Sequence, residues 1–166
     1  MTNNEIMNMY RNLTAVDYDN IRDGKFQFNL MKNIDKAEAE QKQIEKARLK
    51  LRSKPLAAFL DKHQEGIQKA VETYVEEKRA EQVKSGKQLY ITDADIETVQ
   101  TDYLASQDGW KDVSDDYDKF TKAVDQFLKT DNKEFKPHYI EPEYLESLPL
   151  NQTQMRPVYR YLLAKE

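Results

Sequence analysis

Hydrophobic residues recur at helical spacing along most of the chain. Between residues 25 and 53 they step alternately by four and three, which places them in two rows along one long helix. A second amphipathic stripe begins after Pro55 and continues as far as Tyr74. Pro55 cannot continue the first helix but suits the first turn of the next. The pattern therefore predicts a long αα-hairpin over 25–84, bent at Pro55.

Shorter helices are predicted on both sides of this hairpin. Thr2 and Glu5 form a capping box ahead of an apolar face, so a first helix follows them. Thr92 or Asp93 caps another, and 92–129 reads as an acidic helical pair. Its second helix carries the purest apolar row of the chain. We expect four members of that row to be buried together at the centre of the core: Trp110, Phe120, Val124 and Phe127.

After residue 129 the helical pattern breaks. Pro137 forbids a helix around it, so 134–166 is expected to be an extended segment followed by a short C-terminal helix that Asn151 caps. With only four glycines, the chain is poorly suited to a turn-rich β-sandwich or barrel. The fold class is therefore predicted as mainly α, a long αα-hairpin packed with shorter helices, with at most one or two short extended segments. We expect residues 1–166 to form a single helical domain.

Composition narrows the function classes. The absence of cysteine excludes disulfides, thiolate zinc sites and cysteine nucleophiles. No apolar run approaches the roughly 20 residues that a membrane span needs. The first residues lack the basic and apolar regions of a secretory signal. We therefore expect a soluble protein without a membrane partner.

Candidate chemistry is sparse. His63 and His138 are the only histidines, and their separation gives no zinc-ligand pair. His63 lies on an apolar helix face, so we expect it to be a packed residue. The glycines cannot build a phosphate-binding loop. No acid pair stands out among the 30 Asp and Glu residues. The sequence therefore predicts no catalytic, cofactor-binding or metal-binding residues, and no enzyme.

The sharpest local charge feature is a basic stretch over 42–54. It contains Lys42, Lys46, Arg48, Lys50, Arg52 and Lys54. We expect it to be a solvated helix face or an internal match to the acidic second half; a nucleic-acid site is the alternative. Its cations are spread around the helix and the formal net charge is −4, so we expect no nucleic-acid binding.

Apolar and aromatic side chains suggest interaction surfaces instead. The shorter helices cannot cover both hairpin arms to their ends, so we expect apolar residues at the bend to be exposed: Leu51, Leu56, Phe59 and Leu60. Tyrosines also gather near the C-terminus, and three are candidate contacts: Tyr144, Tyr159 and Tyr161. Partly buried rings at the margin of the core are the alternative interpretation of these tyrosines.

Three stretches resemble a family of short uncharacterised helical proteins of tailed bacteriophages of Gram-positive hosts. They are the long helix entered through 28–33, the acidic amphipathic helix over 115–129, and the tail segment 140–145 with Leu148. Together they cover about half the chain, although the middle, 56–91, is longer than the family pattern. The family has no assigned catalytic residues to carry over. The resemblance implies a phage protein located in the host cytoplasm or in the virion.

These observations predict a non-catalytic protein-interaction module that needs no cofactor. The expected role is a phage virion or assembly component, binding itself or a larger phage protein, and a homo-oligomer is the simplest assembly. An inhibitor that binds a host protein is the alternative. A nucleic-acid binder using Lys42–Lys54 is a further alternative.

Overall fold

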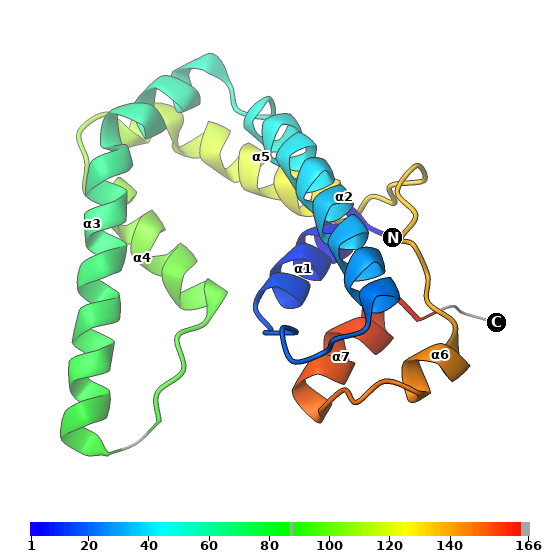
Figure 1. Ribbon diagram of the computed structural model, residues 1–166. Coiled ribbons are helices and arrows are strands. Elements are labelled where there is room, and N and C mark those ends of the chain that lie inside the picture. The colour runs from blue at the N-terminus through cyan, green and yellow to red at the C-terminus, as the bar shows by residue number, and fades with distance from the viewer. Residues whose placement is uncertain (87, 164–166) are drawn as a thin grey trace. The chain divides into compact units, whose positions relative to one another are not determined.

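The computed structural model describes residues 1–86 and 88–163 and confirms a mainly α fold. Pairing between extended residues within these ranges is confined to two isolated β-bridges, Thr2 with Asp131 and Ile140 with Leu163. The described part of the chain forms seven helices (Figure 1): α1 Asn3–Thr14, α2 Gly24–Leu49, α3 Lys54–Ser85, α4 Asp93–Ala105, α5 Trp110–Lys129, α6 Pro142–Glu146 and α7 Gln152–Tyr161.

Local capping chemistry sets where most of these helices begin. The Thr2 and Glu5 side chains form the predicted capping box at α1, and Thr92 and Asn151 open α4 and α7 in the same way. The Ser53 hydroxyl accepts a hydrogen bond from the Leu56 amide at the start of α3. These side chains satisfy amide groups that have no partner within the helix.

The chain packs into two compact units. The first unit comprises Met1–Leu51 and the described residues of 123–166, and the second comprises Arg52–Lys122. The two long helices thus belong to different units, where α2 packs against α1 and α3 packs against α4. The long helices therefore pack against shorter ones, as predicted, and each has its shorter partner within its own unit.

The first unit has its own hydrophobic core. Side chains from α1, α2 and α7 meet residues of the 135–145 segment, and the largest fully buried ones are Phe26, Ile6, Met9, Leu13, Ile21, Leu145, Leu162 and Val158. The helices α1 and α7 also pack directly on each other. This core brings both ends of the described chain into one unit.

Buried side-chain amides attach the irregular segments of the first unit to its helices. The fully buried Asn33 donates to the carbonyl of His138 at 2.9 Å and accepts from its amide at 2.8 Å. Gln154 donates to the carbonyl of Asp17 at 2.8 Å and to Asn20 at 2.6 Å. Asn33 and Gln154 are themselves buried, so these hydrogen bonds satisfy side-chain amides that would otherwise have no partner.

The second unit is built on the close approach of α3 and α4. Its buried core consists of Leu56, Leu60, Leu104 and Val113, with aromatic side chains packed around it. A Cβ atom on Gly66 of α3 would lie 1.7 Å from the Tyr103 hydroxyl of α4. Gly66 is therefore the position that lets the Tyr103 ring lie against α3.

The apolar row of α5 is divided between the two cores. Trp110 and Phe120 pack against the core of the second unit, whereas Phe127 packs against that of the first. All three rings are only partly buried, and Val113 is the fully buried member of the helix. The prediction that Trp110, Phe120, Val124 and Phe127 are buried together is wrong, because one straight row serves two cores.

Replacing Asn33 with alanine is expected to lower the free energy of unfolding by about 2–4 kcal/mol. The change leaves the amide and carbonyl of His138 without their buried partner. Urea unfolding followed by circular dichroism measures the loss. Gln126→Ala, which alters an exposed side chain of α5, is the matched control and should change stability by less than about 0.5 kcal/mol. An equally small effect of Asn33→Ala would contradict the role of this amide.

The effect of Gly66→Ala is expected to change sign with the residue at position 103. In the native background the new methyl group collides with the Tyr103 ring, so stability should fall by about 1–3 kcal/mol. In a Tyr103→Ala background the collision is absent, and alanine should stabilise the helix by up to about 1 kcal/mol. A double-mutant cycle from urea melts tests this. Equal effects in both backgrounds would show that the two residues do not meet.

Candidate protein-binding groove

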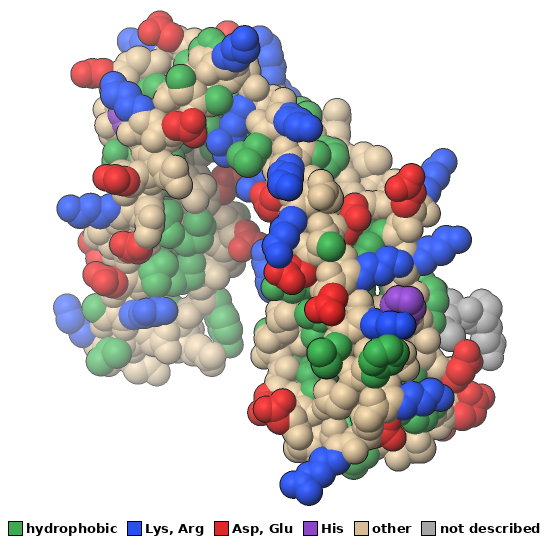
Figure 2. Space-filling model, turned by 45° about the horizontal axis from the view of Figure 1, so that its top comes forward, with side chains coloured by type: hydrophobic (Ala, Val, Ile, Leu, Met, Phe, Trp, Pro, Cys, Tyr) green, Lys and Arg blue, Asp and Glu red, His purple; other side chains and the backbone are tan. Residues whose placement is uncertain are grey.

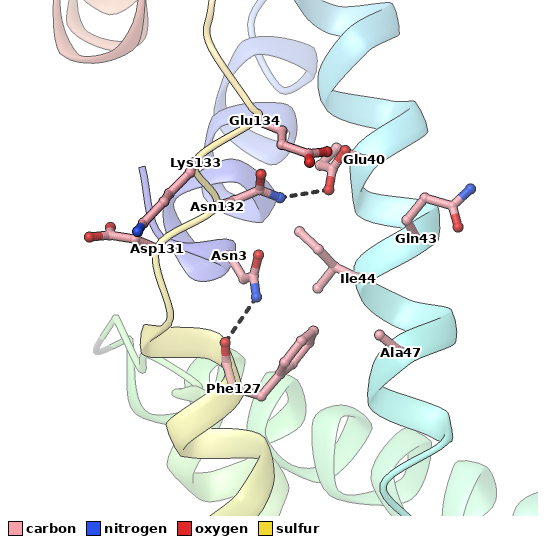
Figure 3. Close-up of a pocket in the computed structure, with 10 residues that line it drawn as sticks. All are labelled: Asn3, Glu40, Gln43, Ile44, Ala47, Phe127, Asp131, Asn132, Lys133 and Glu134. Atoms are coloured by element: carbon pink, nitrogen blue, oxygen red, sulfur yellow. Dashed lines mark hydrogen bonds between the residues drawn. The ribbon is translucent and has the colours of Figure 1, made fainter.

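An open groove of about 460 Å³ lies in the first unit, between the C-terminal half of α2 and the segment that follows α5. Figure 3 shows Ile44 of α2 and the ring of Phe127 pointing into it, with Ala47 beside them. Asn3 closes it from the start of α1. The groove therefore has an apolar floor built from α2 and α5, and α1 closes it with a polar side chain.

Helical periodicity aligns the α2 wall of the groove. Glu40, Ile44 and Ala47 follow one another by four and three positions, so they share one face of the helix. Ile44 is buried, Ala47 is partly exposed, and Gln43 stands at the rim, where Figure 3 shows it pointing outward. Because the side chain of Ala47 is short, it leaves the groove open along this wall.

Side-chain amides and backbone bonds fix the opposite wall. The side-chain amide of Asn132 donates to the Glu40 carboxylate at 2.6 Å, and its backbone amide donates to the Met1 carbonyl at 2.9 Å. Asn3 donates to the carbonyl of Phe127 at 2.9 Å. The Thr2–Asp131 bridge adds a further link between the same segments. The wall after α5 is thus bonded to residues 1–3 and to Glu40 of α2, and α2 packs on α1, so the groove is preformed.

The rim of the groove is acidic. Three carboxylates line it, Glu40, Asp131 and Glu134, against one ammonium group, Lys133. An apolar floor beneath negative charge suits a polypeptide that presents an apolar side chain next to lysine or arginine. Within the described ranges, no group of three or more His, Asp or Glu side chains is arranged to hold a metal ion.

The residues expected to be exposed at the bend are mostly covered. Leu56 and Leu60 are buried in the core of the second unit, and Phe59 is half-buried against His63 and Trp110. The predicted exposure of these three is wrong, because the apolar side of α3 packs within its own unit. Leu51 is exposed to 39%, as predicted.

The three candidate tyrosines differ in exposure. Tyr161 is buried, and its hydroxyl accepts a hydrogen bond from Asn12 at 2.9 Å, so its ring belongs to the core of the first unit. Tyr144 and Tyr159 are partly buried against the core of the first unit, at its margin. The Tyr144 hydroxyl donates to the Asp23 carboxylate, which also caps α2 by accepting from the Phe26 amide at 2.8 Å.

The basic stretch 42–54 is partly neutralised by its own helix. Lys42 pairs with Glu38 at 2.6 Å and Arg48 pairs with Glu45 at 3.0 Å. The Arg52 guanidinium lies over the Phe120 ring, 5.5 Å from its centroid. Figure 2 shows basic side chains interspersed with acidic ones on the face in view. This mixture offers phosphates fewer free cations than the sequence suggests.

Sequence reasoning missed the groove. Residues 3, 44 and 127 lie far apart in the chain, and only the tertiary fold brings them together. No sequence signal pointed to it, because Ile44 belongs to a regular apolar row of the long helix. Sequence reasoning also missed Phe28 and Met31, which α2 exposes to 58% and 60%.

Comparison with protein-family models, with curated proteins and with solved structures finds no match to this chain. Among the helices of residues 1–86 and 88–163, none combines the length and the apolar character needed to cross a membrane.

Replacing Tyr144 with phenylalanine is expected to raise the pKa of Asp23. The Tyr144 hydroxyl and then the Phe26 amide hold the pKa of this carboxyl below its ordinary 3.8. A lowered pKa stabilises the fold above pH 3.8, and the contribution is lost as the pH falls through the folded-state pKa. The stability difference between wild type and Tyr144→Phe should therefore shrink below about pH 4. NMR titration of the Asp23 carboxyl carbon measures the shift directly, with Tyr159→Phe as control.

The same pair predicts an alkaline limit. Burial and then the hydrogen bond to Asp23 raise the pKa of Tyr144 to about 12 from 10.0. The contribution of Tyr144 to the stability of the fold is therefore complete below pH 10 and is lost as the pH rises toward 12. An unchanged Asp23 pKa in Tyr144→Phe would contradict the bond between the two side chains.

Proposed function

We propose that this protein is a non-catalytic interaction module that binds another polypeptide in the groove between α2 and residues 127–134. The observation that carries the proposal is a preformed groove with an apolar floor under an acidic rim. Recognition of a polypeptide needs only such complementary shape and charge, with no reacting group. The resemblance to tailed-phage proteins suggests a virion or assembly partner. Binding to a host protein is the alternative.

A photocrosslinker in place of Gln43 tests the proposal. Gln43 stands at the rim and is exposed, so a benzoyl-phenylalanine there reaches whatever occupies the groove without disturbing its floor. The matched control is the same replacement of Gln68, an exposed residue of α3. Irradiation of cells that make the protein should yield a discrete polypeptide adduct from position 43 and not from position 68.

The mass of the adduct identifies the class of partner. A virion or assembly protein would support the expected role, and a host protein would support the inhibitor alternative. Equal crosslinking from positions 43 and 68, or none from either, would contradict a polypeptide-binding groove.

A further inference from the structure

The first half of α2 exposes an apolar pair of side chains to solvent. Phe28 and Met31 are exposed to 58% and 60%, and they are three positions apart, so they lie next to each other on the helix. Their face is opposite to the one that carries Phe26, Leu30 and Asn33 into the core. On the face of the first unit that Figure 2 shows, apolar side chains lie exposed among basic ones.

Lysines on and beside this face are held against aromatic rings instead of carboxylates. Lys32 lies over the Phe28 ring, 4.5 Å from its centroid, and Lys36 lies over the Phe135 ring at 5.5 Å. Within the part of the chain that the structure describes, neither lysine forms an ion pair with Asp or Glu. An aromatic ring does not neutralise an ammonium group. The edge of this face is therefore positive, although the chain carries a formal net charge of −4.

One carboxylate limits what this face can bind. Asp35 follows Met31 by four positions and Phe28 by seven, so it lies on the same side of the helix, and its side chain is exposed. An anionic bilayer that covered both apolar side chains would also meet this carboxylate, and a phosphate backbone would be repelled by it. A polypeptide can place its carboxylates beside Lys32 and Lys36 and leave Asp35 clear. The position of Asp35 therefore favours a polypeptide.

From these observations we infer that this face is a second interaction surface, which binds an acidic peptide segment carrying an apolar side chain. The apolar side chain packs on Phe28 and Met31 and removes their area from water. Carboxylates of the segment lie beside Lys32 and Lys36, which are about 6 Å apart along the helix axis. The inference goes beyond the proposed function, because the acidic rim of the groove selects a segment of the opposite charge.

NMR titration of the full chain with a synthetic peptide tests the inference. The probe is a peptide of about 12 residues that repeats Glu-Glu-Leu, which matches the length of the 25–36 stretch. The surface is small, so we expect a dissociation constant of about 100 µM that rises with added salt. Chemical-shift changes should centre on the backbone amides of Phe28, Met31 and Lys32 and should leave that of Gln43, at the groove, unchanged.

Matched variants separate the charge from the apolar contact. Lys32→Glu should weaken binding of the peptide about tenfold, and Phe28→Ser should weaken it about fivefold. The controls are Lys62→Glu and Tyr90→Ser, which change an exposed lysine and an exposed ring of the second unit and should leave the affinity unchanged. A peptide that repeats Lys-Lys-Leu should bind at least about tenfold more weakly. All four altered side chains are exposed, and circular dichroism melts check that the variants are folded.

The inference is overturned if the Glu-Glu-Leu peptide does not bind at about 1 mM, or if Lys32→Glu and Phe28→Ser bind it as tightly as the wild type does. Two further probes are a single-stranded oligonucleotide and phosphatidylcholine vesicles with about 30% phosphatidylserine. Stronger binding of either one, lost in Lys32→Glu, would replace the peptide by nucleic acid or by a lipid surface. Shifts at Phe28 on concentrating the protein alone would make a second copy the occupant. The crosslinker at position 43 reports on the groove, so its outcome is independent of this test.

Discussion

The first unit depends on its buried side-chain amides, above all on that of Asn33. Asn33 makes with His138 the pair of hydrogen bonds that a neighbouring strand would make, donating to its carbonyl and accepting from its amide. This exchange fixes the segment between α5 and α6 against α2 without a β-sheet. Phe135 and Ile140 are buried on either side of it, so the amide also determines which apolar side chains of the segment reach the core.

Hydrogen bonds from side-chain amides also fix the groove and the loop before α2. Asn132 holds one wall to Glu40, Asn3 holds the end of α5, and Gln154 holds the Asp17 backbone. Each amide satisfies the polar groups of irregular backbone that lies close to a hydrophobic core. The groove keeps its shape because its walls are cross-linked by side chains whose partners are backbone atoms or other fixed groups.

Helix positions could be predicted from the sequence because their causes are local. Thr2, Thr92 and Asn151 cap helices where the pattern placed them, since a cap depends on residues three positions away. Which helix packs on which is not local. The apolar residues of α5 would have the same 3,4 spacing whether they packed against one core or against two. The spacing therefore could not reveal that Phe120 and Phe127 belong to different units. The burial of Leu56 in the second unit and the position of the groove in the first both follow from this partition.

The first unit is discontinuous in sequence, since the whole of Arg52–Lys122 separates its two parts. During synthesis, α1 and α2 leave the ribosome long before residue 138, the partner of Asn33, and the two positions are 105 residues apart. At about 5–20 residues per second, these 105 residues take about 5–20 seconds to synthesise, and until then the apolar faces of α1 and α2 lack the segments that cover them. The second unit has no such delay, because its residues are contiguous. The first helices of the nascent chain are therefore the part most open to aggregation and to chaperone binding. A circular permutant that opens the chain between the two units would make the first unit contiguous and would remove this delay.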